Sequence, residues 1–591
     1  MNRAPPHAPY GSSRPPTAVA TDGAARRPDG ELTAGLERLG GLIELDGRVS
    51  WFPEHLRTQA PVSCYLLSER AEPLLVDSGL VVHRDEVRHG LTAALGPVQR
   101  VNVIQTRIVE FDTVGNTAAL IACNRVATVY ASFPADDWIH FEEAAAGPAA
   151  HDASHPRFET MQPGGGVRVG SGTDRERWVS VLAAPLRLLA TFWLYDPLTR
   201  TLFTSDSFSH VALEHTDGRL VLRSGAPDRT TSEDVRRHLL AKFAWLADAD
   251  VSPLQAELAG IFEGNAVEHV APTFGCPISG AGAVARHYGL VQQALSDLGP
   301  RSRARRDMAD ERRHADTPQR AAQADRSPRF PRRLTDRSPR FPRRLTDRVH
   351  WLSACLELEE EGETVHAYHS LYVVAGDDAS LIVDTGHPKD WAALSAQLDE
   401  LAEHGIAGVR YVFPTHSEMP HSANLARLLE KYPEAVAVGD VRDYHLSFPG
   451  LEDRMCEMRA GDELDLGGTR FVIVEAIIRD LVTSYWGFDT RDRTLFASDG
   501  FAYMHHHRAG ECGRLADELD ELPVAKFTAA FARHALYWTR FTDMRSPVER
   551  LRAALEELDV ATIAPGHGCP IVNLERTVPE VVRGMLMGAG D

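Results

Sequence analysis

The sequence predicts an α/β protein in which one domain occurs twice, and two observations lead to this fold class. At 591 residues the chain is several times longer than a typical domain of roughly 100–150 residues, so two large domains are expected. Four sequence blocks from the first half recur, in the same order, in the second half. An internal repeat of this length indicates a duplicated fold.

The four matched blocks have the patterns of short strands, turns and helices. They are residues 63–79 with 370–386, 102–120 with 410–428, 195–208 with 488–501, and 267–278 with 560–571. The first pair predicts two strands around a turn, the second of which ends in Asp-x-Gly, where glycine permits a sharp turn. The second pair predicts a strand, an irregular loop and a helix, and the third a hairpin ending in Ser-Asp. The last two pairs share one offset of 293 residues, as between Tyr195 and Phe488.

These blocks divide the chain into a disordered leader (1–30), a first domain (31–300), an Arg-rich disordered linker (301–348) and a second domain (349–591). The linker holds 16 Arg, no Lys and seven acidic residues, and it repeats DRSPRFPRRLT at 325–335 and 336–346. Two prolines per repeat and no helical or strand period are typical of a linker. A basic arm that binds nucleic acid or an acidic partner is the alternative. Without aromatic residues interleaved among the basic ones, a solvated spacer is favoured.

Composition is typical of a soluble globular protein. Hydrophobic residues make up 43% and charged residues 25% of the chain, and no stretch approaches the roughly 18 apolar residues of a membrane span. The formal charge of -20 disfavours nucleic acid as a partner. The leader lacks the apolar core of an export signal, and seven widely spaced cysteines without a CxxC pair indicate reduced thiols. We therefore expect a cytoplasmic protein that makes no membrane contact.

The ordered motifs DTG, THSEMPHSAN, LFASDGF and APGHGCP in the second half resemble the metallo-β-lactamase superfamily. A Glu two residues after the first His is similar to the oxygen-binding diiron proteins and the β-lactamase-like domain of flavodiiron proteins, whereas hydrolases of the superfamily usually carry His there. This resemblance implies an αββα sandwich of two mixed sheets with helices outside. It also implies a metal site at the sheet edge and reduction of dioxygen or nitric oxide at two irons.

The resemblance assigns five metal ligands in the second domain, which are His416, Glu418, His421, Asp499 and His567. Pro420 stands where the motif has an Asp, and Arg479 aligns with a later His of the motif. These departures leave open whether one or two ions bind. A set of imidazoles and carboxylates suits iron, with zinc or manganese as alternatives.

Spacing alone excludes one common metal site. His416 and Glu418 are two residues apart and share one face of an extended segment. His421 follows His416 by five residues, which on a helix would turn it about 140° away. The helical H-E-x-x-H arrangement of zinc proteases needs a spacing of four. A loop at a strand end is therefore predicted, and we expect the nearby run from His505 to His507 to be a solvated loop outside the site.

The first domain keeps only the carboxylates of the motif. Glu110, Asp112 and Asp206 remain, while apolar residues replace the imidazoles, namely Ile108, Leu186 and Phe274. Three carboxylates are able to hold a hard ion such as magnesium or calcium. We favour the other interpretation, a relic pocket filled by the apolar side chains.

Three functions follow from these motifs. The first is a non-haem iron protein of flavodiiron type that binds or reduces a small gas such as dioxygen or nitric oxide. No motif of a flavodoxin-like domain or of paired rubredoxin-type cysteines is found, so a reductase would need a separate electron donor. The alternatives are a metal-dependent hydrolase with a small-molecule substrate, and a non-catalytic scaffold. The two domains are expected to pair within one chain, or as a homodimer.

Overall fold

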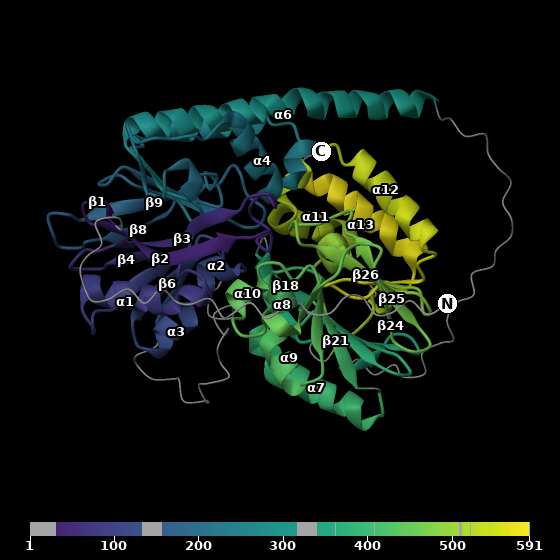
Figure 1. Cartoon of the computed structure of the whole chain (residues 1–591). Helices are drawn as coiled ribbons and strands as arrows, with labels where there is room; N and C mark the ends of the chain where they lie inside the picture. Colours follow the sequence, from purple (N-terminus) through teal and green to yellow (C-terminus); the bar gives the residue numbers. More distant parts are fainter. Residues whose placement is uncertain are drawn as a thin grey trace.

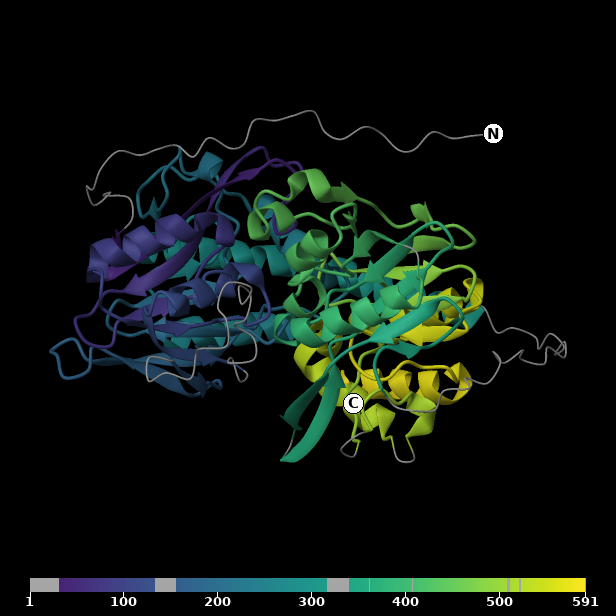
Figure 2. The ribbon, with the colours of Figure 1, turned by 90° about the horizontal axis from the view of Figure 1, so that it is seen from below.

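The computed structural model describes residues 31–132, 156–315, 340–360, 362–406, 408–507, 511–519 and 522–589. Two halves lie side by side, the first coloured purple to teal and the second green to yellow (Figure 1, Figure 2). The predicted leader, 1–30, lies outside the described residues, as does the centre of the Arg-rich segment, 316–339.

The first half contains two seven-stranded mixed sheets. The strands of the first sheet are, in spatial order, β1 (Glu31–Thr33), β2 (Leu36–Leu45), β3 (Thr58–Leu67), β4 (Leu74–Val76), β5 (Val101–Ile104), β6 (Val126–Ala131) and β7 (Arg157–Thr160). Those of the second are β12 (Leu222–Arg223), β14 (Ile278–Ser279), β13 (His269–Pro272), β11 (Thr201–Ser205), β10 (Phe192–Asp196), β9 (Arg177–Ala183) and β8 (Gly166–Val169). The helices are α1 (Arg84–Leu95), α2 (Phe111–Val114), α3 (Thr117–Ala122), α4 (Ser232–Lys242), α5 (Ser252–Gly264) and α6 (Ala281–Ala315).

The second half contains a seven-stranded sheet, a five-stranded sheet and a separate hairpin. The first sheet is ordered β15 (Arg343–Arg344), β16 (Val349–Leu352), β19 (Leu371–Ala375), β20 (Ser380–Val383), β21 (Val409–Phe413), β22 (Val436–Gly439) and β23 (Met455–Glu457). The second is ordered β24 (Glu463–Asp465), β25 (Arg470–Glu475), β26 (Tyr485–Asp489), β27 (Thr494–Phe496) and β28 (Thr562–Ala564), and the hairpin is β17 (Cys355–Glu360) with β18 (Glu363–Tyr368). The helices are α7 (Trp391–Glu403), α8 (Met419–Ser422), α9 (Leu425–Lys431), α10 (Tyr444–Ser447), α11 (Val524–Ala535), α12 (Arg545–Glu557) and α13 (Leu574–Gly588).

In each half the two sheets face one another across an apolar core. Tyr65 of β3 packs edge-on against Phe203 of β11, with ring centroids 5.6 Å apart. In the second half, Tyr372 of β19 meets Phe496 of β27 in the same way at 5.5 Å. Helices cover the outer faces, since the buried residues of α7 and α9 belong to a core cluster on the far side of the first sheet. The outcome is a mixed α/β sandwich, as predicted for the fold class.

The Asp-x-Gly turns position the loops at the edge of each sandwich. Asp77 and Asp384 adopt left-handed φ angles of 59° and 60°, which non-glycine residues rarely do. In the second half, the Oδ1 atom of Asp384 accepts a hydrogen bond from the Thr415 amide at 2.7 Å. This bond ties the end of β20 to the loop that follows β21.

The predicted linker boundaries were too wide on both sides. The helix α6 continues to Ala315, past the expected domain end, and it runs along the upper edge of the view in Figure 1. After the gap in the described residues, β15 joins the first sheet of the second half. There Arg343 is buried and pairs with Glu518, and Phe341 packs edge-on against Trp351 at 4.8 Å. Residues 340–346, the described part of the second DRSPRFPRRLT repeat, therefore belong to a folded domain.

The two halves contact each other through loops. The Met419 amide, beside the predicted metal ligands, donates a hydrogen bond to the Val109 carbonyl at 3.0 Å. Ala249 and Thr542 form an isolated antiparallel bridge. The packing also includes Phe111, which belongs to the same apolar cluster as Met419. The loops at the site edge of the two sandwiches thus lie against one another.

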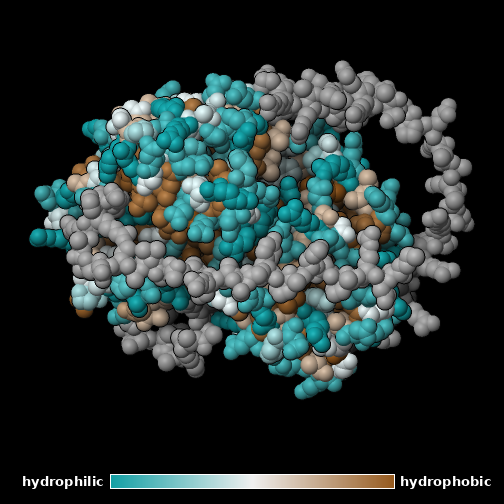
Figure 3. Space-filling model, viewed as in Figure 1, coloured by the Kyte–Doolittle hydropathy of each residue, from teal (hydrophilic) through white to brown (hydrophobic). Residues whose placement is uncertain are grey.

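The face of the molecule seen in Figure 3 is mostly hydrophilic, with hydrophobic side chains in scattered patches. Within the described part of the chain, no helix combines the length and the apolar character needed to cross a bilayer.

Candidate metal centre

The five predicted ligands come from separate loops at one edge of the second sandwich. His416 and Glu418 lie in the loop after β21, and His421 lies in the short helix α8 that follows it. Asp499 lies just after β27, and His567 follows β28. All five side chains are buried. The structure therefore has these residues just after the ends of strands, as the spacing of the motif predicts.

The ring nitrogens of the three histidines converge on carboxylates. The Nε2 atom of His416 lies 3.3 Å from Glu418 Oε2. The Oδ1 atom of Asp499 lies 3.3 Å from the Nε2 atom of His421 and 3.7 Å from that of His567. Four of the residues, His416, Glu418, His421 and Asp499, each offer one ligand atom within 4.8 Å of the others. Residues from distant parts of the chain are thus brought to one point.

The cluster contains one further residue, Asp480, which the sequence motifs did not predict. Asp480 is fully buried at its side chain, and its Oδ2 atom lies 3.2 Å from the Nε2 atom of His416. The alignment of the neighbouring Arg479 with the motif His is therefore wrong by one position. The Arg479 carbonyl accepts a hydrogen bond from the Trp538 indole at 2.7 Å. A carboxylate, rather than a guanidinium cation, faces the site.

Each histidine is oriented through its other ring nitrogen. The Nδ1 atom of His421 donates to the Asp384 carboxylate at 2.9 Å, and that of His567 donates to the Tyr368 carbonyl at 2.7 Å. The Nδ1 atom of His416 is hydrogen-bonded to the Ser498 hydroxyl at 2.9 Å. Because carbonyls and carboxylates only accept, Nδ1 carries the proton in His421 and His567. Their Nε2 lone pairs remain available for a metal, as in many metal sites.

Burial and charge shift the acid–base properties of the cluster. Burial raises the pKa of Glu418 to about 7. Burial alone would lower the pKa of His421, but the carboxylates of Asp384 and Asp499 raise it to about 9. Burial lowers the pKa of His567 to about 4. Several ionisable groups with pKa values displaced in opposite directions, in one buried cluster, are typical of a functional site.

Unpartnered polar atoms test whether a metal fits this cluster. Buried side-chain atoms are nearly always hydrogen-bonded, because an unpaired one costs about 1–3 kcal/mol. Within this cluster, His421 Nε2, Asp480 Oδ2 and Asp499 Oδ1 have no hydrogen-bond partner. All three atoms point toward the other potential ligand atoms of the cluster. A divalent cation would satisfy all three, so the residues fit a metal.

Pro420 occupies the motif position of Asp for a local structural reason. It lies in the first turn of α8, which begins at Met419, and it is buried. Proline is favoured in the first turn of a helix, where its missing N–H has no helical partner. The site therefore lacks this one acidic side chain.

The corresponding place in the first half is filled by two buried cations. The Arg107 guanidinium, with no exposed side-chain surface, pairs with Glu110 and Asp112 and lies 3.0 Å from Asp206 Oδ1. The Lys242 ammonium lies 3.1 Å from Asp206 Oδ1 and 3.4 Å from Glu110 Oε2. Two positive charges thus occupy the place between the three carboxylates and offset most of their negative charge, which corrects the alternative of a magnesium or calcium site.

The apolar side chains predicted to fill that pocket are present, but they are only part of what fills it. Ile108, Leu186 and Phe274 are all buried, and Phe274 stacks on Trp51 with ring centroids 4.3 Å apart. The Lys242 ammonium also lies 5.6 Å from the centre of the Phe274 ring. The pocket is therefore closed by an ion-pair network with an aromatic wall, and no signal in the sequence indicated that Arg107 would turn inward.

A second group of potential ligands borders the metal centre. His369, His387 and Asp390 offer ligand atoms within 4.8 Å of one another. The Nδ1 atom of His369 donates to Asp390 at 3.1 Å, and its ring packs edge-on against His567 at 5.7 Å. These contacts fix the ring of His369, which packs against His567 and helps to hold that ring in place.

Comparisons with known proteins agree with the location of the site. Residues 366–567 match the profile of the metallo-beta-lactamase superfamily. Two curated relatives are the coenzyme F₄₂₀H₂ oxidases of Methanothermobacter marburgensis and Methanocaldococcus jannaschii. The first is 27% identical over 212 residues (34% of this chain and 50% of the relative), and the second is 25% identical over 168 residues (26% and 39%). The chain thus spans half the length, or less, of the curated relatives it matches.

Solved structures similar to this chain include the rubredoxin:oxygen oxidoreductase of Desulfovibrio gigas, with 16% identity and a TM-score of 0.34 over 42% of this chain and 60% of that chain. The flavodiiron protein of Giardia intestinalis has 17% identity and a TM-score of 0.33 over 42% and 58% of the respective chains. The profile match runs from His366 to His567 and so includes every residue of the cluster. The C-terminal region of this chain is therefore a metallo-β-lactamase domain.

Proposed function

We propose that the second half of the chain binds two non-haem iron ions and reduces a small gas, dioxygen or nitric oxide, with electrons from a separate donor. The observation that carries this proposal is the convergence of three Nε2 atoms on the carboxylates of Glu418, Asp480 and Asp499. Mixed imidazole and carboxylate sets suit iron, and the relatives that match this region are named as oxidases.

The donors divide naturally between two ions. His416, Glu418 and Asp480 would hold one ion, and His421 and His567 the other. Asp499 would serve both ions, because its Oδ1 atom faces His421 and His567 and its ligand atom also lies within 4.8 Å of those of His416 and Glu418. Burial would raise the pKa of Asp499, but the three histidines hold it below its usual range, so this shared carboxylate is ionised. Iron, when bound, would supply the open coordination position for the gas and would pass on electrons from the separate donor.

The closure of the site favours a small substrate. Among the six donors, the most exposed residue, His567, has only 8% of its surface accessible to solvent. The loop that carries Glu418 is held against the first half by the hydrogen bond from Met419 to Val109. A diatomic gas reaches such a centre more readily than the thioester, phosphodiester or lactam substrate of a hydrolase. Glu418 in place of an imidazole, and Pro420 in place of the acid that orients a hydroxide, also disfavour hydrolysis.

A single-turnover experiment tests the proposal without knowledge of the natural donor. The full chain is loaded with ferrous iron under anaerobic conditions, freed of excess iron, and mixed with a known amount of dioxygen. We expect rapid gas consumption together with a change in visible absorption. Zinc-loaded protein should consume none. Iron-loaded protein that is inert toward both gases, together with hydrolysis by the zinc form, would exclude the proposal in favour of a hydrolase.

The contact of Asp384 with His421 gives a second, quantitative prediction. Removing an outer-shell partner typically costs 10–100-fold in metal affinity, and Asp384→Asn is expected to weaken iron binding by about this factor. Asp77, which makes the same turn contact to the Thr106 amide in the first half, provides the matched control. Iron titration monitored by competition with a chromogenic chelator measures both variants. Equal losses in the two would show that general destabilisation of the molecule, and not the histidine contact, is responsible.

We also propose that the two halves arose by tandem duplication. Seven strands pair with the same parallel and antiparallel pattern in the first sheets of both halves, from β1 to β7 and from β15 to β23 without the hairpin. Left-handed φ angles recur at positions 293 residues apart, at Ser205 with Ser498 and at Arg200 with Arg493. Backbone conformations that non-glycine residues rarely adopt support common descent, because they are unlikely to recur by chance.

The pairing of the halves would then replace a homodimer. The bridge between Ala249 and Thr542 joins positions 293 residues apart, which is how equivalent loops meet across a two-fold axis. We therefore expect the full chain to sediment as a monomer at micromolar concentration. An obligate dimer, measured by analytical ultracentrifugation, would contradict the intramolecular pair.

A further inference from the structure

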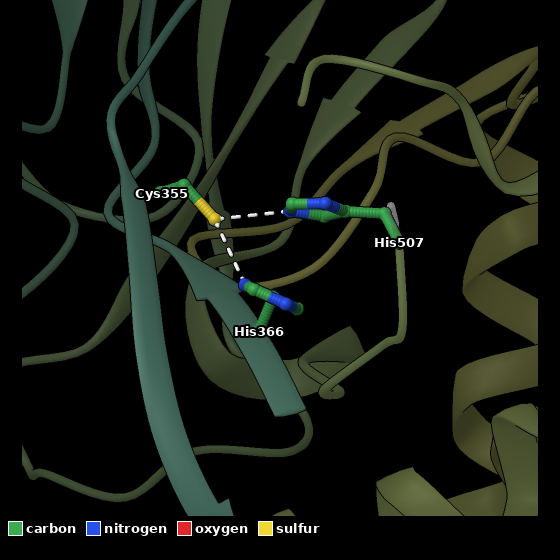
Figure 4. A group of neighbouring side chains, drawn as sticks. All are labelled: Cys355, His366 and His507. Carbon is green, nitrogen blue, oxygen red and sulfur yellow. Dashed lines mark hydrogen bonds between the residues drawn. The ribbon is translucent and has the colours of Figure 1, made fainter. Parts of the chain in front are cut away.

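A second cluster of metal-binding side chains lies outside the centre described above. It is formed by Cys355 and His366 of the β17–β18 hairpin and by His507 and Cys512 of the loop after Asp499. Figure 4 shows Cys355, His366 and His507 with the thiol directed toward both rings. These three residues offer ligand atoms within 4.8 Å of one another.

The hairpin and the loop place these side chains by backbone register. Glu357 pairs with His366 in the hairpin, so Cys355, two residues before Glu357, projects from the same face as His366. His505 then forms an antiparallel bridge with His366, with backbone hydrogen bonds of 2.8 and 2.9 Å. His507, two residues further on, stacks on the His366 ring with centroids 3.9 Å apart. The prediction that the run from His505 to His507 is a solvated loop is therefore wrong for His505, which is buried. It is also wrong for His507, whose ring contacts the Cys355 thiol.

The distances fit a tetrahedral ion. The Sγ atom of Cys355 lies 3.3 Å from His366 Nδ1 and 3.1 Å from His507 Nε2, and the Sγ atom of Cys512 lies 3.5 Å from the same His507 atom. With zinc–sulfur bonds of about 2.3 Å and zinc–nitrogen bonds of about 2.0–2.1 Å, tetrahedral geometry separates S and N by roughly 3.5 Å. These three spacings are close to that value, and Cys512, which is not among the residues whose ligand atoms all lie within 4.8 Å of one another, would move inward to complete the set.

The donor types of the cluster also favour a cation. Thiols and imidazoles are the ligands that zinc prefers, and a divalent metal ion binds thiols as thiolates. Thiol–imidazole hydrogen bonds alone are weak, and they would not explain why one cysteine and two histidines from two segments share one point, with a second thiol 3.5 Å from one of the rings.

We propose that Cys355, His366, His507 and Cys512 bind one zinc ion as a structural site, separate from the iron centre. Two thiolates and two imidazoles form one of the standard sets for structural zinc. The ion would fasten the hairpin to the loop that leads away from Asp499. The same hairpin ends at Tyr368, whose carbonyl accepts the Nδ1 hydrogen bond of His567. Zinc would thus hold the wall of the iron centre in place.

X-ray absorption at the zinc edge tests the site in the unaltered full chain. Protein purified without chelators and supplied with zinc should retain it, with sulfur scatterers at about 2.3 Å and nitrogen scatterers at about 2.0 Å. Zinc bound without any sulfur scatterer would overturn the proposal. A Cys355–Cys512 disulfide in protein kept under reducing conditions, with no zinc retained, would overturn it as well.

Matched variants separate this site from the iron centre. Cys355→Ser and His507→Ala are each expected to lose one equivalent of zinc per chain and the thiolate-to-metal absorption seen after substitution with cobalt. Cys456→Ser, at an exposed thiol, and His506→Ala, at the adjacent ring, should lose neither. Asp499→Asn should keep the cobalt–thiolate absorption. Loss of this absorption in Asp499→Asn, or its retention in Cys355→Ser, would contradict a separate thiolate site.

Discussion

Arg107→Leu is expected to destabilise the first half of the chain by about 3–5 kcal/mol, the typical cost of removing one partner from a buried ion pair. Three buried carboxylates surround this guanidinium, and Lys242 alone would remain to balance them. The loss should shrink as the pH falls toward 5. Burial already raises the pKa of Asp112 to about 7, so protonation removes negative charge that the variant no longer neutralises.

Hydrogen exchange resolved by peptide measures this effect separately in each half. Arg88→Leu is the control, because its pair with Asp85 is exposed and pairs of this kind contribute less than about 1 kcal/mol. Protection in the strands of the second half should be unchanged by either substitution. If Arg107→Leu exchanges no faster than Arg88→Leu throughout the first half, the buried network does not stabilise that half.

Asp499→Asn is expected to reduce iron affinity by well over 100-fold, more than the loss of an outer-shell partner. Its carboxylate faces His421 and His567, and its ligand atom lies within 4.8 Å of those of His416 and Glu418, so both proposed ions depend on it. Asp206→Asn, at the matching position of the first half, should leave the iron content unchanged because cations already surround that carboxylate. Iron analysis after gel filtration measures both. Equal iron content in Asp499→Asn and the unaltered chain would remove Asp499 from the site.

The sequence was sufficient to predict most of the site because its ligands lie in short, ordered motifs. His416, Glu418 and His421 lie within six residues of one another, and the loops that carry Asp499 and His567 follow strands with clear apolar patterns. Asp480 was missed because the segment IIRDL has no feature that distinguishes position 479 from 480. Only the packing of the loop before β26 determines which side chain faces His416.

Other features depend on contacts that no local pattern encodes. Cys355 and Cys512 are 157 residues apart without a CxxC motif, so their approach follows from tertiary structure alone. The burial of Arg107, which follows an apolar strand, could not be predicted from the residues around it. A buried arginine is stable only when carboxylates from elsewhere in the fold neutralise it. The repeat DRSPRFPRRLT looked like a linker by composition, yet Phe341 and Arg343 pack on the second half.

Anomalous X-ray diffraction at the iron edge, from crystals of the full chain loaded with ferrous iron, would locate the bound metal. We expect two iron peaks between the Nε2 atoms of His416, His421 and His567, both beside Asp499, and none beside Arg107 and Lys242. Absence of iron among these histidines, in crystals whose solution holds excess ferrous iron, would contradict the proposed centre.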